Sequence, residues 1–153
     1  MLQRIQTLYL LAAVALCVGC LCTPIAHFVA SECGERLDMY NLWLTSAQGG
    51  HLFSYCPVLM GLLVITSAIL FLDICLYTHR ALQMRLASLS MILLVSWYIA
   101  YGCIICLIQS DVQVAWRPHW TAALPAVALI LTYLAFRGIL RDEMLVRSLD
   151  RLR

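Results

Sequence analysis

Four long apolar runs dominate this chain and leave room for little else among its 153 residues. They cover residues 7–28, 56–77, 86–108 and 121–136, and an apolar helix of roughly 20 residues crosses a bilayer core of about 30 Å. With 63% apolar and only 12% charged residues, the chain cannot hide its apolar surface as a water-soluble protein would. The sequence therefore predicts one all-α membrane domain over residues 1–153, a bundle of four transmembrane helices.

The first run has an alternative reading as a cleaved signal. Leu16-Cys17-Val18-Gly19-Cys20 comes close to a lipoprotein cleavage site. However, Leu21 and Cys22 continue apolar where a mature lipoprotein would turn polar, so a retained span is favoured.

The connections are short except for the first. We expect outer loops over residues 29–55 and 109–120, a link over residues 78–85, and a tail over residues 137–153. In the first loop, weak alternation through Tyr40, Leu42 and Leu44 precedes a Gly49-Gly50 pair, which predicts a short two-stranded hairpin.

The arginines predict the orientation. Lys is absent, and eight of the ten basic residues fall at the amino end, in the link or in the tail, against Arg36 and Arg117 in the other two loops. Short cytoplasmic loops carry this excess, so both termini are expected in the cytoplasm. With eight acidic residues against ten basic ones, the chain has no basic field of the kind that binds nucleic acid.

Eight cysteines raise the possibility of redox chemistry. Cys17 and Cys20 form one Cys-x-x-Cys pair near mid-membrane, where a thiolate is costly, and Cys103 and Cys106 form another nearer the outer face. A disulfide between Cys33 and Cys56 would close the first loop in an oxidising compartment. The favoured interpretation is that most of the cysteines pack as small apolar residues.

The four histidines suggest a haem or metal site only weakly. His27 and His119 alone could share an end of the bundle, and both lie at expected interfaces, where an amphipathic ring is stable. We therefore predict no cofactor and no metal.

Asp73 is the one acidic residue within a predicted span, which makes it a candidate for a proton or ion pathway. Arg80 lies seven residues further along the chain on the same helical face, and Arg85 opens the neighbouring antiparallel helix. A salt bridge at the edge of the membrane is the favoured interpretation.

The tail predicts an amphipathic cytoplasmic helix. A leucine stripe faces a set of charged residues in which Glu143 and Arg147 have the favourable i,i+4 spacing. Such a helix would contact either anionic headgroups or a protein partner. The residues expected to make these contacts are Leu145, Leu149, Leu152, Arg141, Arg147, Arg151 and Arg153.

Three stretches resemble a known family: MLQRIQTLYL at residues 1–10, RALQMRL at residues 80–86, and RDEMLVRSLDRLR at residues 141–153. They are similar to a domain-of-unknown-function family of small four-span inner-membrane proteins of Gram-negative bacteria, and the similarity covers essentially the whole chain. The resemblance implies four membrane helices and a cytoplasmic arginine-rich end. It implies no activity, cofactor or catalytic residue, and the cysteines are not part of the family pattern.

Together these features predict a multi-pass protein of the bacterial inner membrane, most simply a non-enzymatic accessory or scaffold subunit. Its expected partners are the bilayer with its anionic headgroups and another membrane protein or a second copy. Small residues at Ser96, Ala100, Ala122 and Ala126 would permit close helix contact. The alternatives are a quinone- or thiol-linked oxidoreductase that uses Cys33, Cys56, Cys103 and Cys106, and a small transporter or ion pathway that uses Asp73.

Overall fold

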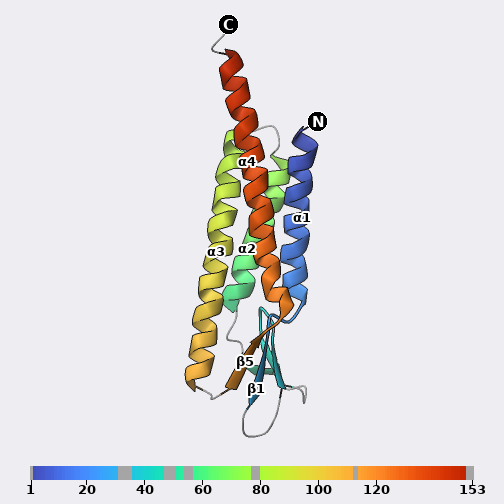
Figure 1. The fold of residues 1–153 in the computed structure, drawn as a ribbon. Coiled ribbons are helices and arrows are strands. Elements are labelled where there is room, and N and C mark those ends of the chain that lie inside the picture. The colour runs from blue at the N-terminus through green and yellow to red at the C-terminus, as the bar shows by residue number, and fades with distance from the viewer. Residues whose placement is uncertain are drawn as a thin grey trace.

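Four long helices lie side by side in the computed structural model, and a small β-sheet covers one end of them (Figure 1). The structure describes the backbone of residues 2–30, 36–46, 51–53, 57–76, 80–111 and 114–150, and side chains over 5–29, 36–45, 57–76, 82–110 and 115–144. The helices are α1 (Leu2–Cys22), α2 (Pro57–Cys75), α3 (Arg80–Asp111) and α4 (Leu124–Asp150). α1 packs against α2 and α4, and α3 packs against the same two helices.

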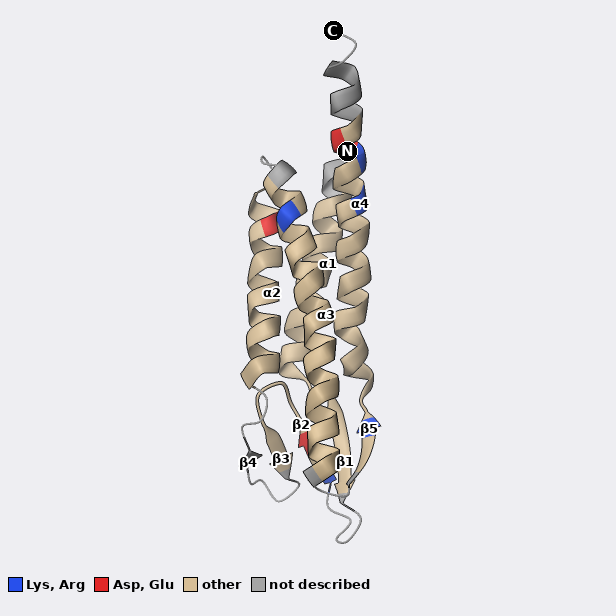
Figure 2. Cartoon of the chain, turned by 90° about the vertical axis from the view of Figure 1, so that its left-hand side faces the viewer, with Lys and Arg blue, Asp and Glu red and all other residues tan. Residues whose placement is uncertain are grey.

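All four helices are long and apolar enough to cross a membrane. The qualifying segments are Ile5–Cys22, Pro57–Cys75, Leu82–Ser110 and Trp120–Met144. Large apolar side chains such as Ile92, Ile99 and Leu107 are more than 60% exposed on the outside of α3, which suits a lipid environment and not water. The charged residues of the described chain gather toward the two ends of the molecule (Figure 2).

We call the two ends of the molecule the sheet end and the terminal end. The terminal end holds the beginning of α1 and the end of α4, and α4 extends beyond the other helices there (Figure 1). Arg85, Arg137 and Arg141 lie toward the terminal end, whereas Arg36 and Arg117 belong to strands of the sheet.

The first helix begins and ends earlier than predicted. The run over residues 7–28 is helical only to Cys22, and a strand occupies Ala26–Ala30. Pro24 explains the break, because proline lacks a backbone donor and disfavours helical geometry in the residue before it. The Thr23 hydroxyl closes the last turn by donating to the Gly19 carbonyl oxygen at 2.9 Å.

α2 covers most of its predicted run over residues 56–77, whereas α3 and α4 are longer than predicted. α3 already begins at Arg80, so most of the expected link over residues 78–85 is helical. A 3₁₀ turn, η1 (Trp120–Ala123), leads into α4, and Pro125 lies in the first turn of α4, where its missing donor costs nothing. α4 then continues without a break through residues 137–150, so the expected tail helix is the end of the last apolar helix.

The fold is mostly helical, but the expectation of an all-α protein is wrong. Five antiparallel strands form one sheet in the order β4-β3-β2-β1-β5, and residues 47–50, with the expected Gly-Gly turn, lie outside the described chain. Besides β1 (Ala26–Ala30), the strands are β2 (Arg36–Met39), β3 (Leu44–Ser46), β4 (His51–Phe53) and β5 (Val114–Pro118). The expected hairpin flanks pair as β3 and β4, but only as one edge of this sheet.

One face of the sheet packs on the ends of the helices. Ala26, Phe28 and Met39 are completely buried there and join the apolar core of the bundle. The intervening side chains point to the opposite face, since neighbouring residues of a strand alternate between faces. Deeper in the bundle the core contains Leu10, Ala13, Cys17, Leu59, Leu63, Leu70, Leu94, Trp97, Ala128 and Ala135.

Candidate functional site at the sheet end

Asn41 anchors the sheet to the helices. It lies in the bend between β2 and β3, and its side chain is 1% exposed. Its amide nitrogen donates to the Cys20 carbonyl oxygen at 2.7 Å, and its amide oxygen accepts from Trp97 Nε1 at 3.3 Å. Cys20 belongs to the last turn of α1, and the carbonyl groups of a last turn have no N–H partner within their own helix. Asn41 therefore completes α1 and contacts α3 with one side chain.

Two tyrosines of α3 strengthen this attachment. The Tyr101 hydroxyl donates to the Ile25 carbonyl oxygen at 3.3 Å, and the Tyr98 hydroxyl donates to the Ala122 carbonyl oxygen at 2.7 Å. The Trp97 and Tyr101 rings stack with their centroids 5.2 Å apart. The backbone of Ile25 is itself fixed, because its N–H donates to the Met39 carbonyl oxygen at 2.7 Å. The sheet is thus held to the helices by buried hydrogen bonds as well as by apolar contacts.

The face of the sheet that points away from the helices carries a row of polar side chains. His27 of β1 pairs in register with Asp38 of β2 on one side and with Arg117 of β5 on the other. Residues directly opposite each other in an antiparallel pair share a face, so the three side chains form a row across three strands. Arg36 also belongs to this face, two residues before Asp38 on the same strand. We call these four residues the polar row.

The polar row is partly paired within itself. Nδ1 of His27 lies 2.6 Å from Oδ1 of Asp38, so the single carboxylate of the row is already engaged. Arg36 and Arg117 are exposed, and neither forms an ion pair with any residue whose side chain the structure describes. The row can therefore offer two guanidinium groups to an anionic partner on an otherwise rigid surface.

His119 completes the edge of this surface. Its ring meets the His27 ring edge to face, with centroids 4.9 Å apart, and its Nδ1 lies 2.8 Å from the Thr121 hydroxyl. The structure thus brings together the two histidines that the sequence placed at one end. Among the described residues, no group of three or more His, Cys, Asp or Glu side chains is arranged to hold a metal ion.

Asp73 lies far from this surface, near the end of α2. It is completely buried, and neither carboxylate oxygen has a hydrogen-bond partner among the residues that the structure describes. The backbone of Asp73 does form a hydrogen bond with a side chain: Gln83 Nε2 donates to the Asp73 carbonyl oxygen at 3.5 Å. Arg85 is exposed, and the Arg80 side chain lies outside the described residues. Of the two arginines expected to pair with Asp73, Arg85 does not do so, and the pairing with Arg80 stays a prediction.

The cysteines divide into two groups. Cys17 and Cys20 are completely buried in the core as free thiols, whereas Cys103 and Cys106 are free thiols exposed on the outside of α3. Cys33 and Cys56 lie outside the described residues, so the disulfide proposed between them stays a prediction. No described cysteine belongs to the surface that carries the polar row.

The candidate contacts of the tail are only partly described. Arg141 is exposed on α4, whereas the side chains of Leu145, Arg147 and Leu149 and all of Arg151, Leu152 and Arg153 lie outside the described chain. The sequence interpretation did not identify Asn41 or the polar row. The position of Asn41 between apolar residues could have marked it as a buried hydrogen-bonding residue. The polar row could not be found in this way, because it depends on pairing between strands about 90 residues apart, such as that of His27 with Arg117.

The comparisons with known proteins agree with the resemblance seen in the sequence. A family profile described as a domain of unknown function, DUF4293, matches residues 2–152. The match covers nearly the whole chain, so the chain belongs to this family. No curated protein matches the sequence.

Proposed function

We propose that this member of the DUF4293 family is a multi-pass protein of the inner membrane of Gram-negative bacteria, with four spans and both termini in the cytoplasm. Four apolar helices of sufficient length support the four spans. The excess of arginine in segments at the terminal end supports the orientation, because such segments resist translocation. The sheet then lies on the periplasmic side.

Its role in this proposal is that of a non-enzymatic accessory subunit, which presents the polar row to a partner. The observation that carries it is the pair of exposed arginines, Arg36 and Arg117, on a sheet that Asn41 fixes to the helices. A rigid surface loses little conformational entropy on binding, which favours affinity. Two exposed guanidinium groups that form no ion pair with a described side chain favour an acidic segment on the partner.

Site-specific photo-crosslinking tests this role in intact cells. Ala115 is exposed and pairs with Val29, which places it on the same face as the polar row. A photo-crosslinking residue at Ala115 is expected to give a discrete protein adduct. The same residue at Ile99, on the exposed outside of α3, is the control for contacts with lipid and passing proteins.

The adduct at Ala115 should disappear when Arg36 and Arg117 are both changed to Gln. An adduct pattern at Ala115 that matches the Ile99 control, or that is indifferent to the two arginine changes, would remove the accessory role.

The orientation has its own test. In a cysteine-free background, Ala115→Cys and Met144→Cys report on the sheet end and the terminal end respectively. A membrane-impermeant maleimide added to whole cells should label Ala115→Cys and reach Met144→Cys only after the membrane is opened. The reverse order of labelling would show that the termini are periplasmic.

A second candidate function rests on Asp73, whose buried carboxylate has no partner among the described residues. Carboxylates at such depth line proton and ion pathways in many transporters. Proteoliposomes with an internal pH dye would show proton flux in the unaltered protein and none in Asp73→Asn. Equal flux in both, or flux in neither, would eliminate this candidate.

A further inference from the structure

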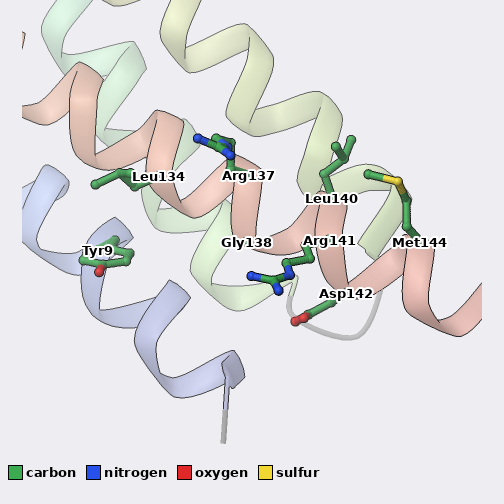
Figure 3. A pocket seen from close by; sticks show the side chains of 8 residues that line it. All are labelled: Tyr9, Leu134, Arg137, Gly138, Leu140, Arg141, Asp142 and Met144. Atoms are coloured by element: carbon green, nitrogen blue, oxygen red, sulfur yellow. The ribbon is translucent and has the colours of Figure 1, made fainter.

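A groove of about 500 Å³ lies along α4 at the terminal end, and nothing described so far uses it. Tyr9 of α1 forms one wall, and seven residues of α4 form the rest (Figure 3). The Arg141 side chain extends from α4 toward α1, whereas Arg137, Leu140 and Met144 lie along the upper edge of α4 in this view. The α4 residues that line the groove are Leu134, Arg137, Gly138, Leu140, Arg141, Asp142 and Met144.

α1 and α4 make a close contact at two residues that line the groove, Gly138 and Asp142. Gly138 has no side chain, and a Cβ atom at that position would lie 3.0 Å from Gln6 Nε2. The Gln6 amide fills this space and donates to Asp142 Oδ2 at 2.9 Å. The contact joins residues 136 positions apart, so the groove exists only in the folded bundle.

The contact also determines the charge of the groove. Among the described residues that line it, Asp142 alone is acidic, and the Gln6 amide donates a hydrogen bond to that carboxylate. Arg137 and Arg141 are exposed and form no ion pair with the described side chains. They are four residues apart on one helix, so their side chains are neighbours on the same face. Two cationic groups therefore lie together, and no described carboxylate forms an ion pair with either.

The apolar part of the groove continues toward the middle of the molecule. Leu134 lies about one turn before Arg137 and is 41% exposed. The apolar span of α4 runs from Trp120 to Met144, so the arginines lie near its end, at the depth expected for lipid headgroups. A ligand that fits would carry an anionic group beside the arginines and an apolar chain beside Leu134.

We propose that this groove binds one anionic phospholipid of the cytoplasmic leaflet, with its phosphate between Arg137 and Arg141 and the start of one acyl chain against Leu134. One guanidinium group can donate two parallel hydrogen bonds to the oxygens of a phosphate, which makes arginine well suited to this contact. The assignment of the leaflet rests on the proposed orientation, but binding itself does not. Binding and orientation can therefore fail independently.

Native mass spectrometry of the full-length protein in mild detergent measures this binding directly. Phosphatidylglycerol and phosphatidylcholine with identical acyl chains are added in equal amounts, and the bound fractions are compared. The unaltered protein should retain one phosphatidylglycerol in preference to phosphatidylcholine. Each of Arg137→Gln and Arg141→Gln should lower that preference about fivefold, because an arginine near a lipid phosphate contributes on that scale.

Arg85→Gln is the matched control, since Arg85 is an exposed arginine on α3 outside the groove. It should leave the preference unchanged. Arg137→Lys should keep part of the preference, because it keeps the charge but loses the paired hydrogen bonds. A preference that falls equally in Arg85→Gln, or that survives the combined Arg137→Gln and Arg141→Gln change, would overturn the proposal.

Two competitors distinguish other sources of the anion. Inorganic phosphate or an oligoglutamate peptide is added at the same molar concentration as the lipid. Neither should displace phosphatidylglycerol, because neither has an acyl chain for the apolar part of the groove. Displacement by phosphate would make this a site for free anions, and displacement by the peptide would make it a protein-docking site; either result overturns the lipid assignment.

Discussion

At the scale of single residues, a few buried polar side chains decide how distant parts of this chain meet. Asn41 joins a bend of the sheet to α1 and α3, and Gln6 joins α1 to α4. Both satisfy groups that would otherwise be buried without partners, which is costly inside an apolar bundle. Asp73 is the opposite case, a buried carboxylate without a hydrogen-bond partner among the described residues.

We predict that Asn41→Asp destabilises the protein more than Asn41→Ala. Alanine leaves the Cys20 carbonyl and the Trp97 N–H unpaired, at about 2–4 kcal/mol for the two groups together. Aspartate in addition places a carboxylate oxygen against the Cys20 carbonyl. Unfolding of the purified protein in detergent by heat or denaturant measures the order. Ser96→Ala is the control, because that exposed hydroxyl bonds only within α3, and it should change stability little.

Asp73→Asn should raise stability by about 1–3 kcal/mol if the carboxylate serves no structural contact. The substitution keeps the shape of the side chain and removes a group that is expensive to bury without a partner. The same unfolding measurement tests it. A clear loss of stability would show that Asp73 has a partner in the membrane, and Arg80 would be the first to examine.

At the scale of elements, the sequence predicted the presence and order of the four helices, but not the residues at which they begin and end. Four apolar runs were sufficient to find α1 to α4, because burial in lipid requires such runs whatever the tertiary packing. The strand β1 was hidden, since Ala26, Phe28 and Val29 extend the first apolar run and Pro24 was the one local sign of a break. β5 was hidden because its short sequence, which contains Trp116, also fits an interfacial loop. The sheet depends on pairing between distant segments, which no local pattern records.

The contact between α1 and α4 gives a prediction with an internal control. In a helix interior, Gly→Ala adds about 1 kcal/mol of stability through helix propensity. Gly138→Ala should lose most of this gain, because the new methyl group displaces Gln6 from Asp142. In a Gln6→Ala background the space is free, so Gly138→Ala should stabilise by the full amount. A double-mutant cycle measures the difference, and additive effects would show that Gln6 does not fill the space beside Gly138.

At the scale of the whole molecule, the helices are longer than a bilayer is thick. At 1.5 Å per residue, 32 residues of α3 and 27 of α4 give about 48 Å and about 40 Å, against a hydrocarbon core of about 30 Å. The excess length places both ends of these helices in or beyond the headgroup layers. The groove and the sheet lie at opposite ends of the molecule (Figure 1), and the arginine distribution in the sequence located neither of these two sites.

The outer surface of the bundle offers a further test. A phospholipid with a photoactivatable diazirine at the end of its acyl chain labels side chains in contact with lipid. Ile92, Ile99 and Phe71 should be labelled, because each is at least 60% exposed, whereas the fully buried Leu63 and Leu94 should not. Peptide mapping by mass spectrometry reads the result on the unaltered protein. If Leu94 were labelled as strongly as Ile92, a different side of α3 would be in contact with the bilayer.

The uninterrupted course of α4 has a mechanical consequence. β5 leads through His119 and η1 straight into α4, which is then one helix as far as Asp150. Because α4 is unbroken, the number of residues between η1 and the Arg137–Arg141 pair sets the direction in which the pair points relative to the sheet. A single residue inserted between them would turn the pair by about 100° relative to the sheet, and a seven-residue insertion would restore its direction while moving it about 10 Å outward.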